Sequence, residues 1–202
     1  MGCYNKLLTG YLAGVCISIG GIVYLLSENK IVGSILFSIA LLTICFMNLA
    51  LYTGRIGFIV DNFSKQKLID IIYCLIGNVL GVLSIGLLWP KTSSLYVIAN
   101  KVVENKISHS LYISFINAVV CGVIMYIAVW IYKNKNSIIG ILFGIPTFIL
   151  SGFEHSIADM FYIILSKSFS IDIFIFILIV FVGNTIGSIF FSIIFKNSYQ
   201  RE

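Results

Sequence analysis

The residue types best suited to chemistry in this chain lie close together, between two strongly apolar runs. Glu154, His155 and Asp159 follow the apolar run 139–150 and precede the run 160–165. A charged side chain at the depth of a lipid bilayer is costly, so such groups face the interior of a helix bundle or water. All three are therefore candidates for binding an ion or moving a proton. For the two carboxylates, the alternative is a purely structural role in holding a broken helix.

His155 is the candidate for the central chemical step. A neutral imidazole in a narrow pore can donate one hydrogen bond to a small anion, or hand it a proton. A proton transfer would let a weak acid cross an apolar constriction uncharged, without the cost of desolvating an ion. The alternative is a packed histidine bonded to a backbone carbonyl.

A second interruption lies in an earlier apolar stretch, at residues 51–55. Thr53 offers a hydroxyl that can face a substrate opposite His155, and Gly54 permits a break in the helix. We expect a helix after Gly54 whose N-terminal amides point toward the pore centre, a favourable place for an anion. The alternative is a simple kink sealed by the threonine.

The two interruptions belong to an internal repeat. The pattern G-N-x-apolar-G occurs as GNVLG around Asn78 and again as GNTIG around Asn184. Each copy lies downstream of one interrupted stretch, so we predict two repeats at about 1–90 and 108–202. Three spans in each half would make the repeats inverted. Inverted repeats with discontinuous helices are typical of transporters and channels, because broken backbone at membrane depth persists only where it lines a cavity.

The composition places these elements in a bilayer. Of 202 residues, 59% are hydrophobic and 10% are charged, and the mean hydropathy is +1.06, whereas a soluble domain has about a quarter of its residues charged. We predict an all-α membrane protein: one transmembrane domain over 1–202, with six spans of which the second and fifth are broken. The stretches free of Asp, Glu, Lys and Arg are 7–27, 31–54, 71–90, 107–132, 136–153 and 173–195.

Charge and motifs limit the remaining classes of function. The formal net charge of +5 lies in loops and ends, so it indicates orientation rather than nucleic-acid binding, and the Lys/Arg distribution favours both termini on the cytoplasmic side. The sequence contains no HExxH, no GxSxG and no cysteines at metal-ligand spacing. We therefore expect no enzyme, no metal and no cofactor.

The residues around His155 resemble a known family. Residues 152–160 read GFEHSIADM, which is similar to the GFEHSIANM signature of the formate/nitrite transporters. Residues 52–54 resemble that family's LFTG break, 121–130 its fourth-span pattern ending in AVW, and 183–184 its sixth-span GN. The resemblance covers nearly the whole chain. It implies an aquaporin-like fold, assembled as a homopentamer with one pore per protomer.

The resemblance also implies roles for individual residues. His155 matches the family's central histidine and Thr53 its break threonine. The residues matching the two hydrophobic constrictions are Leu41 and Phe148 toward the outside, and Leu51 and Met125 toward the inside. Lys106 matches a vestibule lysine that attracts anions. The residues expected to support the breaks are Glu154, Gly152, Gly54, Asn78 and Asn184.

Two departures bear on substrate preference. The family's fourth-span asparagine is Gly122 here, which removes a polar pore group, and the late asparagine of the signature is Asp159. Without the resemblance, the constriction residues are ordinary apolar residues and Lys106 is a solvated loop charge.

We therefore predict a channel or proton-coupled carrier for small anions of weak acids, namely formate, nitrite and hydrosulfide, in a bacterial inner membrane. The alternative is a pore for neutral solutes such as water, glycerol or ammonia. That pore would conduct without anion competition or pH dependence. A third hypothesis, an intramembrane enzyme using Glu154 and His155 as acid and base, lacks any supporting motif.

Overall fold

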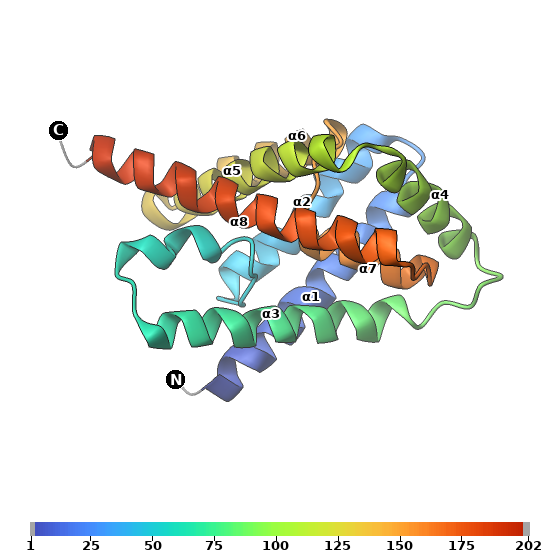
Figure 1. The fold of residues 1–202 in the computed structure, drawn as a ribbon, viewed down its shortest axis with the longest axis horizontal. Coiled ribbons are helices and arrows are strands. Elements are labelled where there is room, and N and C mark those ends of the chain that lie inside the picture. The colour runs from blue at the N-terminus through green and yellow to red at the C-terminus, as the bar shows by residue number, and fades with distance from the viewer. Residues whose placement is uncertain (1–2, 200–202) are drawn as a thin grey trace.

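The computed structural model describes residues 3–199, and within this range it contains helices and no strand. This confirms the predicted all-α class. Figure 1 shows the helices running along one long axis, with both described ends at one end of the molecule and α4 at the other. The helices are α1 (Cys3–Leu26), α2 (Lys30–Phe46), α3 (Lys65–Gly86), α4 (Ser94–Ser108), α5 (Leu111–Lys135), α6 (Ile139–Leu150), α7 (Ser156–Ser166), α8 (Ile171–Tyr199) and the short 3₁₀ helix η1 (Ile56–Asp61).

Both predicted breaks interrupt the helices. The chain leaves α2 at Phe46 and resumes in η1 at Ile56, and it leaves α6 at Leu150 and resumes in α7 at Ser156. Among the described residues, four helices (α1, α3, α5 and α8) are long and apolar enough to cross a membrane, whereas α2, α6 and α7 are shorter apolar helices. That the broken pairs complete two further spans stays a prediction.

Glycines bring the long helices into close contact in pairs. In the α1–α3 pair, an added Cβ at Gly14 would collide with the backbone of Asn78, and one at Gly81 would collide with the backbone of Tyr11. In the α5–α8 pair, a Cβ at Gly187 would collide with the backbone of Val119. Small residues allow such close approach of helices in a bilayer, where burial of apolar surface does not by itself drive packing.

The stretch between α3 and α5 differs from the sequence-based expectation. Without the family resemblance, Lys106 was expected to be a solvated loop charge, but residues 94–108 form α4. Its buried positions, Leu95, Ala99 and Val103, recur every four residues and pack on one face. Helix α4 packs against α7 and thereby brings its last turn to the second break.

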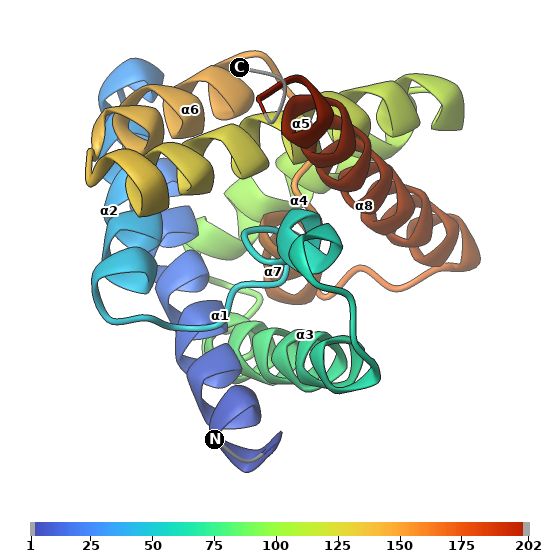
Figure 2. The ribbon, with the colours of Figure 1, turned by 90° about the vertical axis from the view of Figure 1, so that its left-hand side faces the viewer.

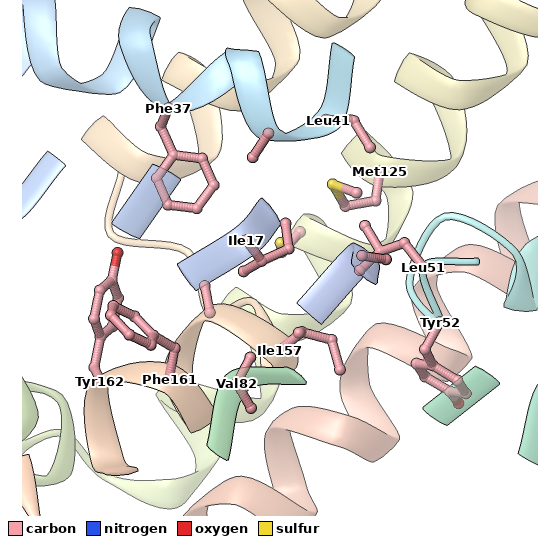
Figure 3. Packing of buried hydrophobic residues seen from close by; sticks show 14 of the residues in the cluster. Ile17, Phe37, Leu41, Leu51, Tyr52, Val82, Met125, Ile157, Phe161 and Tyr162 are labelled. Carbon is pink, nitrogen blue, oxygen red and sulfur yellow. The ribbon is translucent and has the colours of Figure 1, made fainter. Parts of the chain in front are cut away.

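The core combines side chains from both halves of the chain. Leu41, Leu51 and Met125 belong to one buried cluster that also contains Phe148 and Ile157, and Figure 3 shows most of these side chains at close range. The outer faces of the long helices, in contrast, carry many exposed large apolar side chains, such as Leu12 on α1 and Phe190 on α8. Viewed from the end that carries the termini, the helices surround η1 and α7 (Figure 2).

Candidate functional site

The two breaks meet at a single hydrogen bond. Thr53 Oγ1 lies 2.8 Å from His155 Nε2, although the two residues are 102 positions apart in the chain. Their exposed fractions are 1% and 2%. The sequence predicted that these side chains face one another across the pore, and the structure brings them together.

His155 begins α7 and its ring is bonded on both sides. The backbone N–H of Ala158 donates to Nδ1 at 3.2 Å, so the ring is the N-cap of the helix. A nitrogen that accepts a hydrogen bond carries no proton, which assigns the proton of the neutral ring to Nε2. Nε2–H then donates to Thr53. Phe148 stacks on the imidazole, with ring centroids 5.4 Å apart and planes inclined by 19°.

Asn184 on α8 holds the second break. Its Nδ2 donates to the carbonyl oxygens of Ala118 and Glu154, each at 2.8 Å, and its Oδ1 accepts from the N–H of Ser156 at 2.8 Å. Backbone groups freed by a broken helix need such partners because no water is available within a membrane. One buried amide therefore satisfies both sides of the break and ties it to α5.

Asn78 on α3 does the same for the first break. Its Nδ2 donates to the carbonyl oxygens of Gly10 (2.8 Å) and Ala50 (2.7 Å), and its Oδ1 accepts from the N–H of Tyr52 at 2.8 Å. The two asparagines thus bond to equivalent places: a long helix of the same half, the carbonyl before the break and the amide after it. This correspondence is what an internal repeat predicts.

Glycine and arginine residues complete the breaks. Gly152 has φ +70°, a left-handed conformation that residues with a Cβ adopt at a cost. A Cβ at Gly54 would lie 3.3 Å from a side-chain atom of Val129. This contact is tight, and the Val129 side chain would have to shift slightly. Arg55 donates to the carbonyl oxygens of Asn48 and Leu49 at 3.3 and 3.0 Å, a supporting contact that the sequence did not reveal.

Lys106 is not a free vestibule charge. Its ammonium pairs with the Glu154 carboxylate and also lies 3.0 Å from Asp159 Oδ1. Burial alone would lower the pKa of Lys106, but Asp159 and Glu154 raise it above its ordinary value, so the ammonium stays charged. The second oxygen of Asp159, Oδ2, is buried without a hydrogen-bond partner.

One cavity of about 330 Å³ opens at the α4 end and reaches His155. It contacts the end of α1 at Tyr24 and the beginning of α2 at Lys30. Its ionisable lining residues are Tyr24, Lys30, Lys101, Lys106, His109, Glu154, His155, Asp159 and Tyr162. Phe148 also lines this cavity beside the histidine.

A second cavity, of about 190 Å³, contacts the opposite end of α2. Leu51 and Gly54 line it from the first break, and Leu41 lines it from α2. The charged residues in its lining are Arg55 and Lys133. The two breaks therefore border different cavities, and the Thr53–His155 hydrogen bond joins the two breaks.

The four predicted constriction residues are all buried. Leu41 was expected on the same side as Phe148, but the cavities pair it differently. Leu41 lines the cavity of Leu51 rather than the cavity of Phe148. Gly122 lies where α5 packs on α8, and an added Cβ there would collide with the backbone of Asn184. This glycine thus allows α5 and α8 to pack closely, and its predicted pore role stays a prediction. Among residues 3–199, no cluster of three or more His, Cys, Asp or Glu side chains is arranged to hold a metal ion.

Comparison with known proteins gives consistent matches over the whole chain. The sequence profile described as "Formate/nitrite transporter" matches residues 1–197. The formate channel FocA of Escherichia coli is 30% identical over 79% of this chain, and that of Haemophilus influenzae is 23% identical over 79% of it. These alignments span 66% of either channel's length. The uncharacterized transporter YrhG of Bacillus subtilis is 26% identical over 98% of this chain and 86% of its own length.

Solved structures share the fold. A pentameric formate channel with formate bound superposes with a TM-score of 0.85 at 18% identity, covering 99% of this chain and 98% of that one. An ion channel of the FNT family superposes with a TM-score of 0.79 at 22% identity, covering 97% and 89%.

Proposed function

The chain belongs to the formate/nitrite transporter family, and from this premise we propose that it conducts small monovalent anions of weak acids, with formate, nitrite and hydrosulfide as substrates. The observation that carries the proposal is the Thr53–His155 hydrogen bond, which joins the two breaks with a cavity on either side. A polar pair confined by apolar side chains suits a small solute that can exchange a hydrogen bond or a proton.

In this proposal His155 acts on an anion that loses its hydration shell as it enters apolar surroundings. The buried residues Leu41, Leu51, Met125 and Phe148 surround the path with apolar surface, through which an ion passes only at great cost. An acid that is protonated, or that accepts the Nε2–H hydrogen bond as its charge is neutralised, avoids most of that cost. The weak acid therefore crosses the centre in its neutral form.

The distribution of positive charge supports a topology with both termini cytoplasmic in a bacterial inner membrane. A groove of about 640 Å³ surrounds η1 at the end that carries the termini, and Lys and Arg outnumber Asp and Glu among its lining residues. Loops rich in Lys and Arg stay on the cytoplasmic side. In this arrangement the α4 end faces outward.

We further propose a homopentamer with one pore in each protomer. The exposed large apolar side chains on the long helices need either lipid or a neighbouring subunit, and the structural neighbour with formate bound is described as pentameric. Native mass spectrometry should give a particle of five 22.5 kDa chains. A monomer that retains transport activity would contradict the proposal.

The test of function is a flux panel in proteoliposomes with formate, nitrite, hydrosulfide, acetate, lactate and glycerol, at about pH 5.5 and about pH 7.5, on either side of the histidine range. Uptake of one or two small acids that rises as the pH falls is the expected result. His155→Ala vesicles, which should lose this uptake, and empty liposomes are the controls. Permeation of glycerol or water without anion flux would instead favour the neutral-solute pore.

A further inference from the structure

Lys106, Glu154 and Asp159 form an acidic cluster in which two carboxyl groups share one ammonium. Lys106 Nζ pairs with Glu154 Oε2 and with Asp159 Oδ1, and both acidic residues are almost fully buried, at 1% and 2% exposed. All three side chains line the cavity at the α4 end. The cluster and His155 therefore border the same cavity.

The charges of this cluster do not balance when both carboxyl groups are ionised. One ammonium compensates one carboxylate, and a second buried carboxylate without its own partner is strongly unfavourable. Asp159 Oδ2, in addition, is buried and accepts no hydrogen bond. A proton on one of the two carboxyl groups restores neutrality, and both groups lie against the same ammonium.

Other groups around Asp159 do not provide the missing positive charge. The ionisable side chains that interact with it are Lys106 on α4, Glu154 in the break, Tyr162 on α7 and Cys121 on α5. Tyr24 on α1, His109 at the end of α4 and His155 line the same cavity, as do Lys30 and Lys101. Lys30 is engaged by the carbonyl oxygens of Tyr24 and Leu25.

His155 is poorly placed to supply a proton itself. Nδ1 accepts the N-cap hydrogen bond from Ala158, and Nε2 bonds to Thr53. Protonating Nδ1 would remove the N-cap, so the geometry favours a neutral ring that donates a hydrogen bond through Nε2. A proton for the substrate must then come from another group that lines the cavity.

We propose that Asp159 is the proton donor of the α4-end cavity, an inference that rests on the proposed transport of weak-acid anions. The O–H bond of the Asp159 carboxyl group breaks as an O–H or S–H bond forms on the anion, and the neutral acid moves on to His155. Lys106 and the N-terminal turn of α7 stabilise the carboxylate left behind. Water at the cavity mouth returns the proton, so each anion enters together with one proton.

The experiment compares wild type with Asp159→Asn in proteoliposomes, measuring initial formate uptake and proton uptake (with a trapped pH dye) over about pH 5.5 to 7.5. Wild-type uptake should fall roughly tenfold per pH unit where the donor loses its proton. Asp159→Asn should flatten this dependence to about threefold or less over the whole range. Asp159→Glu should keep a steep dependence with a shifted midpoint. Asp172→Asn, which removes an exposed carboxylate at the start of α8, should leave the dependence unchanged.

Each outcome separates this inference from the proposed function. If wild type transports formate and Asp159→Asn keeps the same pH dependence, with the same elution in gel filtration, Asp159 is not the donor, although the channel proposal stands. If wild type carries no small anion at any pH, the proposed function itself fails. If Asp159→Asn does not assemble, Asp159→Glu decides the question. A steep pH profile with a shifted midpoint and proton co-uptake supports the proposal, and an unshifted midpoint or the absence of proton co-uptake overturns it.

Discussion

The ring of His155 couples the contact between the two breaks to the stability of a helix. Because Nδ1 is the N-cap of α7, a proton added there would cost the helix its cap, of the order of 1 kcal/mol. The same ring positions Nε2–H toward Thr53. In the proposed channel, Thr53 therefore fixes the direction of the Nε2–H bond that an anion would meet.

Replacing Thr53 by valine tests this positioning at nearly constant volume. The variant leaves the buried Nε2–H without an acceptor, which costs about 1–3 kcal/mol, and we expect the ring to turn and formate uptake to fall at least about tenfold. Initial uptake rates in proteoliposomes measure the effect. Thr53→Ser keeps the hydroxyl and should retain most of the activity; an unchanged rate in Thr53→Val would show that this hydrogen bond plays no part.

At this scale the sequence predicted that Thr53 and His155 lie on opposite sides of a substrate, and the structure shows them hydrogen-bonded to each other. The Thr53–His155 pair followed from two interruptions at matching places in a repeat. The contacts of Lys106 with Glu154 and Asp159 did not, because α4 was read as an irregular connection and an ammonium in a loop has no defined partner. The spacing of Leu95, Ala99 and Val103 carries the helical period that would have placed Lys106 on a structured element.

The broken helices depend on their unbroken neighbours. Neither η1 nor α7 is long enough to satisfy its own ends, and each break is instead held by an asparagine from the next long helix, Asn78 or Asn184. Sequence analysis predicted the breaks and their supporting residues. It also predicted a helix directly after Gly54, whereas the structure has a single six-residue 3₁₀ segment, Ile56–Asp61, because the chain turns back toward α3 at Asn62.

Gly122 gives a prediction at the element scale. An alanine there brings its Cβ against the backbone of Asn184, so α5 and α8 must separate, and overpacking of this kind costs about 1–3 kcal/mol. Gly122→Ala should lower the thermal unfolding midpoint of the detergent-solubilised protein. Gly144→Ala is the matched control, because a Cβ there meets only side-chain atoms of Ala128 and Ile124, at 3.3 Å. Equal unfolding midpoints for the two variants would show that the packing of α5 on α8 does not require a glycine at position 122.

The whole molecule contains two close helix pairs, each with its own break, and the two breaks meet at the Thr53–His155 hydrogen bond. The α1–α3 pair holds the first break and the α5–α8 pair holds the second, while contacts such as Thr53–His155 and the Tyr52–Thr185 hydrogen bond (2.7 Å) join them. We propose that these two helix pairs, each with its break, are the inverted repeats predicted from the recurrence of the G-N-x-apolar-G pattern. Their extent rests on that pattern and on the equivalent asparagine contacts.

A chain divided in the loop between α3 and α4 tests this organisation. Fragments 1–90 and 91–202 each keep one close helix pair and its asparagine, so we expect them to co-purify and to regain transport when they are expressed together. Either fragment alone should accumulate poorly, because it leaves one side of the central contact in lipid. Co-expressed fragments that fail to associate would show that the halves do not assemble as units.

The asparagine contacts also set an order of events during synthesis. The backbone N–H of Tyr52 bonds to Asn78, which is synthesised 26 residues later. The backbone N–H of Ser156 bonds to Asn184, which is synthesised 28 residues later. At a synthesis rate of about 5–20 residues per second, each amide is made roughly one to six seconds before its asparagine partner. During that time the nascent chain holds polar backbone that lipid cannot accommodate, so it must remain within the insertion machinery. Loss of either asparagine should therefore appear first as failed delivery to the membrane, before any pore exists to be measured.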